Sequence, residues 1–72
     1  MFSKEVFGQR LKEVRQKNGE KQYELAEYLG LNKSRVSEME KGLVGTTFEK
    51  LFMICEHYGV SSDYLLGLKD EP

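Results

Sequence analysis

The stretch from residue 22 to residue 39, QYELAEYLGLNKSRVSEM, constrains the fold of this chain more than any other. Apolar or small residues recur at helical spacing on both sides of a single glycine, Gly30. Glycine can adopt the left-handed conformation that ends a helix without a Cβ clash. The sequence therefore predicts two short helices that cross at a steep angle and are joined by a tight turn. The recurring residues are Leu25, Ala26, Leu29, Leu31, Val36 and Met39.

Residue size and placement within this pair favour one kind of helical hairpin. Ala26 stands where the two helices would cross, and its small side chain would let them approach closely. Leu29 and Leu31 flank the turn, and both are expected to point inward. Periodicity alone is equally compatible with an ordinary hairpin whose polar faces are solvated. The combination of features favours a helix-turn-helix, whose second helix usually lies in the DNA major groove. Its outward residues would be Lys33, Ser34, Ser37 and Glu38.

The remaining sequence predicts three further helices. No segment alternates between polar and apolar residues with a period of two, so no sheet is expected. The predicted fold class is all-α with five short helices, over residues 4–17, 22–29, 33–41, 47–58 and 61–66. Expected N-terminal caps are Ser3, Asn32, a capping box of Thr46 and Glu49, and Ser61 or Ser62.

Length and composition indicate one small domain over residues 1–72, with the helix-turn-helix at about 22–41. The only proline is Pro72, so no proline interrupts a predicted helix. The most apolar run, residues 51–55, is far shorter than a bilayer span. No secretory signal pattern is visible at the N-terminus, so we expect a cytoplasmic protein without a membrane segment. Cys55 lies in an apolar helical stripe and is expected to be buried.

The net charge of −1 is not typical of a nucleic-acid-binding protein, but the charges are unevenly distributed. Residues 1–50 hold ten of the eleven basic residues and eight of the twelve acidic ones. The N-terminal part is therefore mildly positive and the C-terminal part negative. Because a local basic patch matters more for affinity than the total charge, this distribution is compatible with DNA binding. From charge alone, an ordinary solvated surface remains an alternative explanation.

Catalytic chemistry has little support in the sequence. His57 is the only histidine, and Cys55 lies two residues before it, a spacing that does not bring helical side chains face to face. No third orienting group, glycine-rich phosphate loop or metal-ligand cluster accompanies them. We therefore expect no enzyme activity, no cofactor and no bound metal.

Three segments together resemble a known family. The segment KQYELAEYLGLNKSRVSEMEKG closely resembles the motif of lambda-repressor-like, Xre-type regulators, which include phage repressors and Cro proteins. The opening FGQRLKEVRQKNG is similar to that family's first helix, and YGVSSDYLLG is similar to its end. The resemblance covers nearly the whole chain. It implies a five-helix DNA-binding fold and a transcriptional regulator, more specifically a repressor. Such a protein would bind a pseudo-palindromic operator as a homodimer, with the third helix in the major groove.

The resemblance also implies which residues contact DNA. Lysine can donate to guanine, serine can donate or accept, and glutamate can accept from cytosine. A glutamine at the start of the second helix would bind a phosphate beside the helix dipole. For each position the alternative is a solvated helix face. Residues expected to reach base edges are Lys33, Ser34 and Glu38. Those expected to contact the DNA backbone are Gln22, Asn32, Arg35, Lys41, Lys21 and Tyr23.

Two further groups of residues are expected to have structural roles. In the resembled family, an arginine late in the first helix and a glutamate ending the third form a buried ion pair, here Arg15 and Glu40. Exposed apolar residues outside the core would mark a dimer interface. For Phe48 and Tyr64, core packing is an equally good explanation. The candidate interface residues are Leu43, Val44, Phe48, Tyr64 and Leu68.

The sequence departs from the family pattern around the second helix and after the third. Glu20 and Lys21 stand where a hydrophobic residue and a serine or threonine usually begin the second helix. The loop of residues 43–45 carries no charge, so fewer phosphate contacts and a shallower salt dependence are expected. Two other functions stay open. One is an antitoxin-like module that binds a protein partner and autoregulates its operon. The other is a protein-interaction module that has lost DNA binding.

Overall fold

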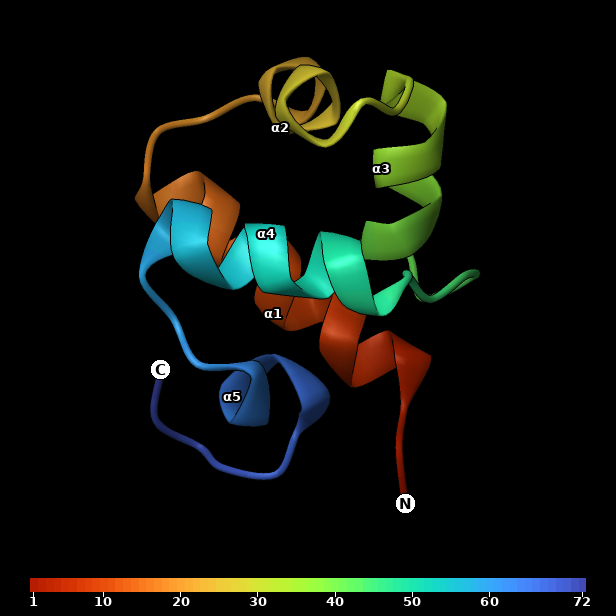
Figure 1. The fold of residues 1–72 in the computed structure, drawn as a ribbon. Coiled ribbons are helices and arrows are strands. Elements are labelled where there is room, and N and C mark those ends of the chain that lie inside the picture. The colour runs from red at the N-terminus through yellow and green to blue at the C-terminus, as the bar shows by residue number, and fades with distance from the viewer.

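The computed structural model describes all 72 residues of the chain. It contains five helices and no strand, which confirms the predicted all-α class. In Figure 1, α4 crosses in front of α1, α2 and α3 form one end of the molecule, and α5 lies at the other end. No helix is both long enough and apolar enough to span a lipid bilayer. The helices are α1 (Lys4–Lys17), α2 (Gln22–Leu29), α3 (Lys33–Glu40), α4 (Phe48–Tyr58) and α5 (Ser62–Leu66).

Side-chain caps fix the starts of three helices as the sequence predicts. The Ser3 hydroxyl accepts from the Val6 amide of α1 at 3.1 Å, and the Asn32 side chain accepts from the Arg35 amide of α3 at 2.8 Å. Ser61 caps α5 through its hydroxyl. Each cap satisfies an amide that has no partner inside its helix, which typically stabilises the helix by about 1 kcal/mol.

The predicted start of α4 is wrong by one residue. Thr47, not Thr46, is the N-cap, and its hydroxyl accepts from the Lys50 amide at 3.2 Å. The Thr46 hydroxyl is buried without a hydrogen-bond partner. Either of two adjacent threonines can cap a helix, and helix boundaries shift by a residue or two, so the pattern with Glu49 could not distinguish them.

The core is formed by apolar side chains from all five helices. The expected inward residues of the helix-turn-helix are confirmed: Ala26 is 2% exposed and Val36 is fully buried. Burying one such aliphatic or aromatic side chain completely contributes about 1.5–3 kcal/mol relative to leaving it exposed. Cys55 departs from its prediction because it is only half-buried, packed against the edge of the core. The core comprises Phe7, Leu11, Val14, Leu25, Ala26, Leu29, Val36, Met39, Ile54, Tyr64 and Leu65.

Gly8 allows the backbones of α1 and α3 to touch. A Cβ atom at Gly8 would overlap the carbonyl oxygen of Met39 and would lie 2.7 Å from that of Glu40. Both oxygens belong to the last turn of α3, so any larger residue would push that helix away from α1. This contact holds the C-terminal end of α3 at a fixed distance from the core.

Tyr64 belongs to the core, so of the two explanations left open for it, core packing holds and the dimer interface does not. Its side chain is 7% exposed, and the Arg10 guanidinium lies over its ring at 4.4 Å from the centroid. Arg10 also donates to the carbonyl oxygens of Tyr64 and Lys69, which ties the C-terminal segment to α1. Burial and the nearby Glu13 carboxylate raise the pKa of Tyr64. Sequence spacing could not predict this burial because it depends on how α5 packs on α1.

Candidate nucleic-acid interface

The turn between α2 and α3 is built as the sequence predicts. Gly30 follows α2 with a φ of 71°, the left-handed conformation that favours glycine. The Leu31 amide then donates to the Ala26 carbonyl at 2.8 Å, which closes the end of α2. Asn32 caps α3 immediately afterwards. The two helices therefore meet across a short turn, with Ala26 buried between them.

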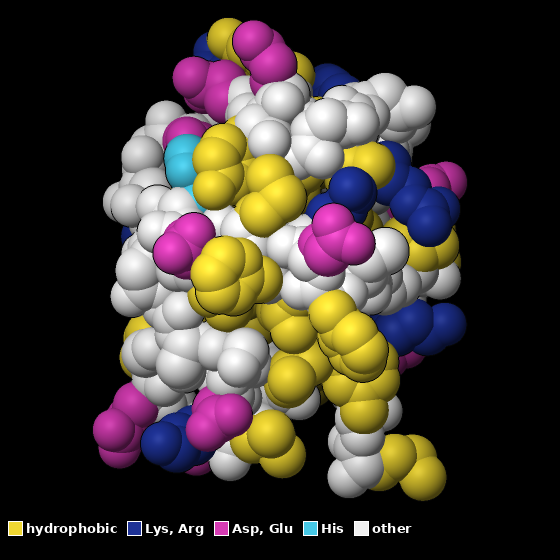
Figure 2. Space-filling view, viewed as in Figure 1, with side chains coloured by type: hydrophobic (Ala, Val, Ile, Leu, Met, Phe, Trp, Pro, Cys, Tyr) yellow, Lys and Arg dark blue, Asp and Glu magenta, His cyan; other side chains and the backbone are white.

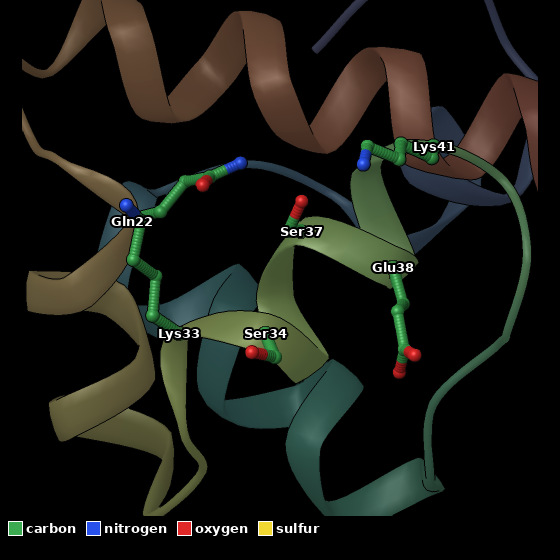
Figure 3. A pocket seen from close by; sticks show the side chains of 6 residues that line it. All are labelled: Gln22, Lys33, Ser34, Ser37, Glu38 and Lys41. Atoms are coloured by element: carbon green, nitrogen blue, oxygen red, sulfur yellow. The ribbon is translucent and has the colours of Figure 1, made fainter.

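The outer side of α3 borders a shallow polar hollow with a volume of about 390 Å³. None of the residues that line it is hydrophobic. Figure 3 shows that they come from the start of α2, the outer side of α3 and the residue after α3. The hollow unites all three predicted base-contacting residues with two of the six predicted backbone-contacting ones. Its lining residues are Gln22, Lys33, Ser34, Ser37, Glu38 and Lys41.

Ser37 is the one lining residue for which the sequence predicted no DNA contact, neither to a base nor to the backbone. Its outward position was predicted, but no base contact was assigned to it. The available signal was its spacing, because Ser37 is four residues after Lys33 and three after Ser34. Residues so spaced are neighbours on a helix surface.

Positive charge predominates around the hollow. Lys33 and Lys41 are exposed on its lining, and Arg35 is exposed on α3 beside it. The only carboxylate in the lining, Glu38, lies 3.5 Å from the Arg35 guanidinium, with both side chains about half exposed. Basic side chains gather beside α3 in the space-filling view (Figure 2). Arg35 thus offsets part of the negative charge of Glu38.

Beneath this face lies the expected ion pair between α1 and α3. Arg15 Nε donates to Glu40 Oε2 at 2.6 Å, and Arg15 Nη2 donates to Glu40 Oε1 at 2.9 Å. The Glu40 side chain is 2% exposed. Hydrogen bonding to Glu40 raises the pKa of the Arg15 guanidinium. Such a bidentate buried pair requires both partners, because removing one leaves an uncompensated buried charge.

Gln22 is also tied to this pair. Its Nε2 donates to Glu40 Oε1 at 3.0 Å, so the side chain is not a freely solvated surface group, which was the alternative to the predicted phosphate contact. It is half-buried at the first position of α2. One amide hydrogen is thus directed to Glu40, while the other stays available on the side of the hollow.

The N-terminus of α2 has no side-chain cap, as the unusual Lys21 suggests. Instead, the Glu24 carboxylate accepts from the Lys21 amide at 2.8 Å, which is half of a capping box. The Glu24 amide donates to the Lys21 carbonyl at 3.0 Å, which leaves the Gln22 and Tyr23 amides for an acceptor outside the helix. This end of α2 borders the polar hollow through Gln22.

Comparison with known proteins identifies the family. The sequence model of the Helix-turn-helix family matches residues 11–65, which is most of the chain. The chain belongs to this family. Over 64 residues it is 44% identical to the HTH-type transcriptional regulator ImmR of Bacillus subtilis, covering 89% of this chain. The chain spans 50% of the length of ImmR.

Solved structures of helix-turn-helix proteins share the fold. The P22 c2 repressor protein, solved in complex with a synthetic operator, superposes with a TM-score of 0.77 at 27% identity. That match covers 83% of this chain and 91% of the repressor chain. SinR of Bacillus subtilis, a master regulator for biofilm formation solved in complex with DNA, superposes with a TM-score of 0.74 at 34% identity. It covers 83% of this chain and 97% of the SinR chain.

The remaining predicted backbone contacts lie outside the hollow of this helix-turn-helix domain. Lys21 and Tyr23 are exposed, and Tyr23 lies in a separate hollow with Glu24, Glu27 and Tyr28. Because the carboxylates of Glu24 and Glu27 would repel a DNA phosphate, a phosphate contact of Tyr23 is unfavourable there. Asn32 is exposed, but its side-chain oxygen is engaged in capping α3.

Glu20 makes a polar contact with α4 that the sequence analysis missed. Its carboxylate lies 2.8 Å from His57 Nε2 and accepts from the Tyr58 hydroxyl at 2.8 Å. The ring of Tyr28 stacks on His57, with the centroids 4.1 Å apart. Burial acts to raise the pKa of Glu20, but the hydrogen bonds from Tyr58 and His57 outweigh it and hold the pKa below its ordinary value. The sequence feature that could have indicated this contact is Glu20 itself, because the family usually has a hydrophobic residue at its position.

Proposed function

We propose that this chain is a sequence-specific DNA-binding transcriptional regulator that acts as a repressor. It would bind a pseudo-palindromic operator as a homodimer, with α3 in the major groove. The observation that carries this proposal is the polar hollow over α3, which contains no hydrophobic residue and has positive charge around it. The similarity to ImmR, and to two proteins solved with operator or DNA, supports the same function. No comparison favours the antitoxin-like alternative.

Base recognition is assigned to the outer side of α3. Lys33 would donate to guanine O6 or N7, and Ser34 and Ser37 would donate or accept at neighbouring base edges. Glu38 would accept from cytosine N4 while repelling phosphates, so it would select sequence rather than add affinity. Because Arg35 lies 3.5 Å from Glu38, an Arg35 that turns to a phosphate would free that carboxylate for a base.

Backbone contacts would set the register of α3 in the groove. The uncapped amides at the start of α2 and the second amide hydrogen of Gln22 suit a phosphate oxygen. Lys41 supplies a charge at the other end of α3. With a net charge of −1 and an uncharged loop at residues 43–45, the chain would neutralise few phosphates, which gives a shallow dependence of affinity on salt.

Selection of bound duplexes from a random DNA library tests this proposal. We expect enrichment of an inverted repeat whose half-sites lie about one helical turn apart, ~10–10.5 bp centre to centre. A variant with Lys33→Ala and Ser34→Ala, two exposed positions, serves as the matched control and should lose the base preference while keeping its helical circular dichroism spectrum. Failure of the folded wild-type protein to enrich any sequence would refute the proposal.

A further inference from the structure

Lys50 is a cation that neither the fold nor the proposed DNA contacts explain. It is the only lysine or arginine between Lys41 and Lys69. It lies half-buried in the first turn of α4, and its ammonium group forms no ion pair within the chain. Because the N-terminal end of a helix carries a partial positive charge, a cation there is unfavourable on its own. An anion that approached Lys50 from outside the chain would remove this penalty.

Lys50 lines a hollow together with Arg35, between α3 and the start of α4. In Figure 1, α4 begins near the C-terminal end of α3. The hollow has a volume of about 190 Å³, and no carboxylate lines it. Two cations without an anion create a positive potential that favours a negatively charged ligand. We call this site, defined by Arg35, Thr46, Thr47 and Lys50, the Arg35–Lys50 hollow.

The residues around this hollow neither fill it nor add a charge to it. The loop of residues 43–45 is uncharged, and its Val44 packs against the edge of the core, so Val44 is not available to the predicted dimer interface. Phe48, for which core packing and an interface were both open, is 91% exposed and lines other hollows. The exposed Glu49 is absent from the lining. Arg35 and Lys50 are thus the charges that decide what the hollow binds.

Arg35 lies between this hollow and the polar hollow over α3. Its guanidinium is 3.5 Å from the Glu38 carboxylate, and both side chains are about half exposed. Such an exposed ion pair contributes little stability and is easily exchanged for another. Glu38 lines the polar hollow, whereas Arg35 lines the Arg35–Lys50 hollow. An anion held beside Lys50 would therefore draw Arg35 away from Glu38.

We propose that the Arg35–Lys50 hollow binds a phosphate of the DNA backbone, and that this contact releases Glu38 for base recognition. The Arg35 guanidinium donates to the phosphate oxygens through its planar fork, and Lys50 adds a point charge. Glu38, without its partner on α3, then accepts from cytosine N4. Selection at this base pair is thus conditional on a correctly placed backbone. This inference rests on the proposed function, because it requires α3 to lie in the major groove.

The phosphate contact is tested by operator binding of wild type, Lys50→Gln and Lys69→Gln. Lys69→Gln is the matched control, because it removes the same charge from the segment after α5, at the other end of the molecule from α3. Lys50→Gln should weaken binding about 5- to 10-fold at 0.1 M salt and reduce the slope of log affinity against log salt by about one. Lys69→Gln should change neither value appreciably. If Lys50→Gln bound DNA as Lys69→Gln does, with an unchanged circular dichroism spectrum, the proposal would be overturned.

The release of Glu38 has a readout that loss of a phosphate contact alone does not move. Glu38→Gln first identifies the base pair at which discrimination depends on this carboxylate. In Lys50→Gln, Arg35 stays paired with Glu38, so discrimination at that base pair should fall about 3-fold or more. Discrimination at the base pair read by Lys33 should stay unchanged. If Lys50→Gln weakened binding to all single-base variants by one common factor, Glu38 would not be released by this contact and the proposal would be wrong.

A competition experiment distinguishes a DNA phosphate from a free one. Inorganic phosphate added at constant ionic strength should not displace the operator from wild type, because the hollow is filled by the DNA backbone. Displacement from wild type but not from Lys50→Gln would assign the hollow to free phosphate and overturn the proposal.

These measurements separate this inference from the proposed function. If wild type enriches an inverted repeat but Lys50→Gln matches Lys69→Gln, the Arg35–Lys50 hollow is rejected as a phosphate site and the DNA-binding function stands. If folded wild type enriches no DNA sequence, the DNA-binding function is rejected, and this inference is rejected with it.

Discussion

Helices α3 and α4 use their side chains in opposite ways. Helix α3 has eight residues, of which Val36, Met39 and Glu40 are buried, and its outer side is wholly polar. Helix α4 has eleven residues and is much more apolar, yet it buries only Ile54 and exposes two phenylalanines. The shorter, more polar helix is thus the more firmly anchored one.

This comparison shows that a helix need not be apolar to be held firmly against the rest of the fold. Helix α3 is held by close backbone contact at Gly8 and by a bidentate ion pair, so its outer side is free to be polar. Helix α4 keeps apolar side chains on its outer side, where they do not stabilise the isolated chain. The outer side of α3 is the surface that we propose for DNA.

Removing the ion pair that holds α3 to α1 should lower the stability of the fold more than any other change considered. Glu40→Ala leaves the Arg15 guanidinium buried without its carboxylate, which should lower the free energy of unfolding by about 3–5 kcal/mol and unfold much of the protein at 37 °C. Thermal and urea denaturation followed by circular dichroism measure this. Glu38→Ala, on the exposed side of the same helix, should change stability by less than about 0.5 kcal/mol. An unchanged melting temperature for Glu40→Ala would show that the ion pair does not anchor α3.

Separating the backbones of α1 and α3 should be the next largest change. Gly8→Ala places a methyl group against the carbonyl oxygens of Met39 and Glu40, so α3 must move. We expect a loss of about 2–3 kcal/mol, although alanine favours the helix more than glycine does. Gly45→Ala is the control, because no atom lies within 4 Å of its added Cβ. If Gly8→Ala were as stable as Gly45→Ala in urea denaturation, the close contact would not constrain the packing.

A substitution on the polar side of α3 should alter sequence preference instead of stability. Lys33→Ala should cost about 1–3 kcal/mol at its preferred base pair and relax selection there. Lys41→Ala should weaken binding to all sequences by a similar factor and reduce the salt slope by about one. Competition binding against single-base operator variants measures both. Equal loss across all variants for Lys33→Ala would assign Lys33 to the DNA backbone.

The contact between Glu20 and α4 should have the smallest effect, and it should depend on pH. Because the pKa of Glu20 is lowered in the folded state, its stabilisation is present above the ordinary glutamate pKa of about 4.3 and is lost as pH falls through the lowered value. Glu20→Gln should therefore cost about 1 kcal/mol at pH 7. Urea denaturation at pH 7 and pH 3 should show this difference shrinking at the lower pH. Glu27→Gln, exposed on α2, should match wild type at both values.

The helices were predictable from the sequence because their signals are local. Ser3, Asn32 and Gly30 mark helix ends through contacts within a few residues, and the structure confirms them. The start of α4 was missed because Thr46 and Thr47 offer the same local chemistry. The Arg15–Glu40 pair was expected only through family resemblance, since the two residues are 25 positions apart.

Features that depend on how helices pack were not predictable. The composition of α5 and α4 did not indicate that Tyr64 is covered while Phe52 is exposed. Tyr64 is covered partly by Arg10, which lies over its ring and donates to the Lys69 carbonyl in the segment after α5. Likewise, only coordinates show that Gly8 faces the end of α3 and that Glu20 reaches His57. The DNA-contacting roles within the polar hollow stay predictions.

The hydrogen bond from Gln22 to Glu40 has a consequence for the entropy of binding. A free glutamine on a surface loses up to about 2 kcal/mol of rotamer freedom when a ligand fixes it. Here the fold has already fixed the Gln22 amide through a carboxylate that is itself held by Arg15. An acceptor that approaches the first turn of α2 therefore meets a preorganised donor, and the ordering cost falls on folding instead of association.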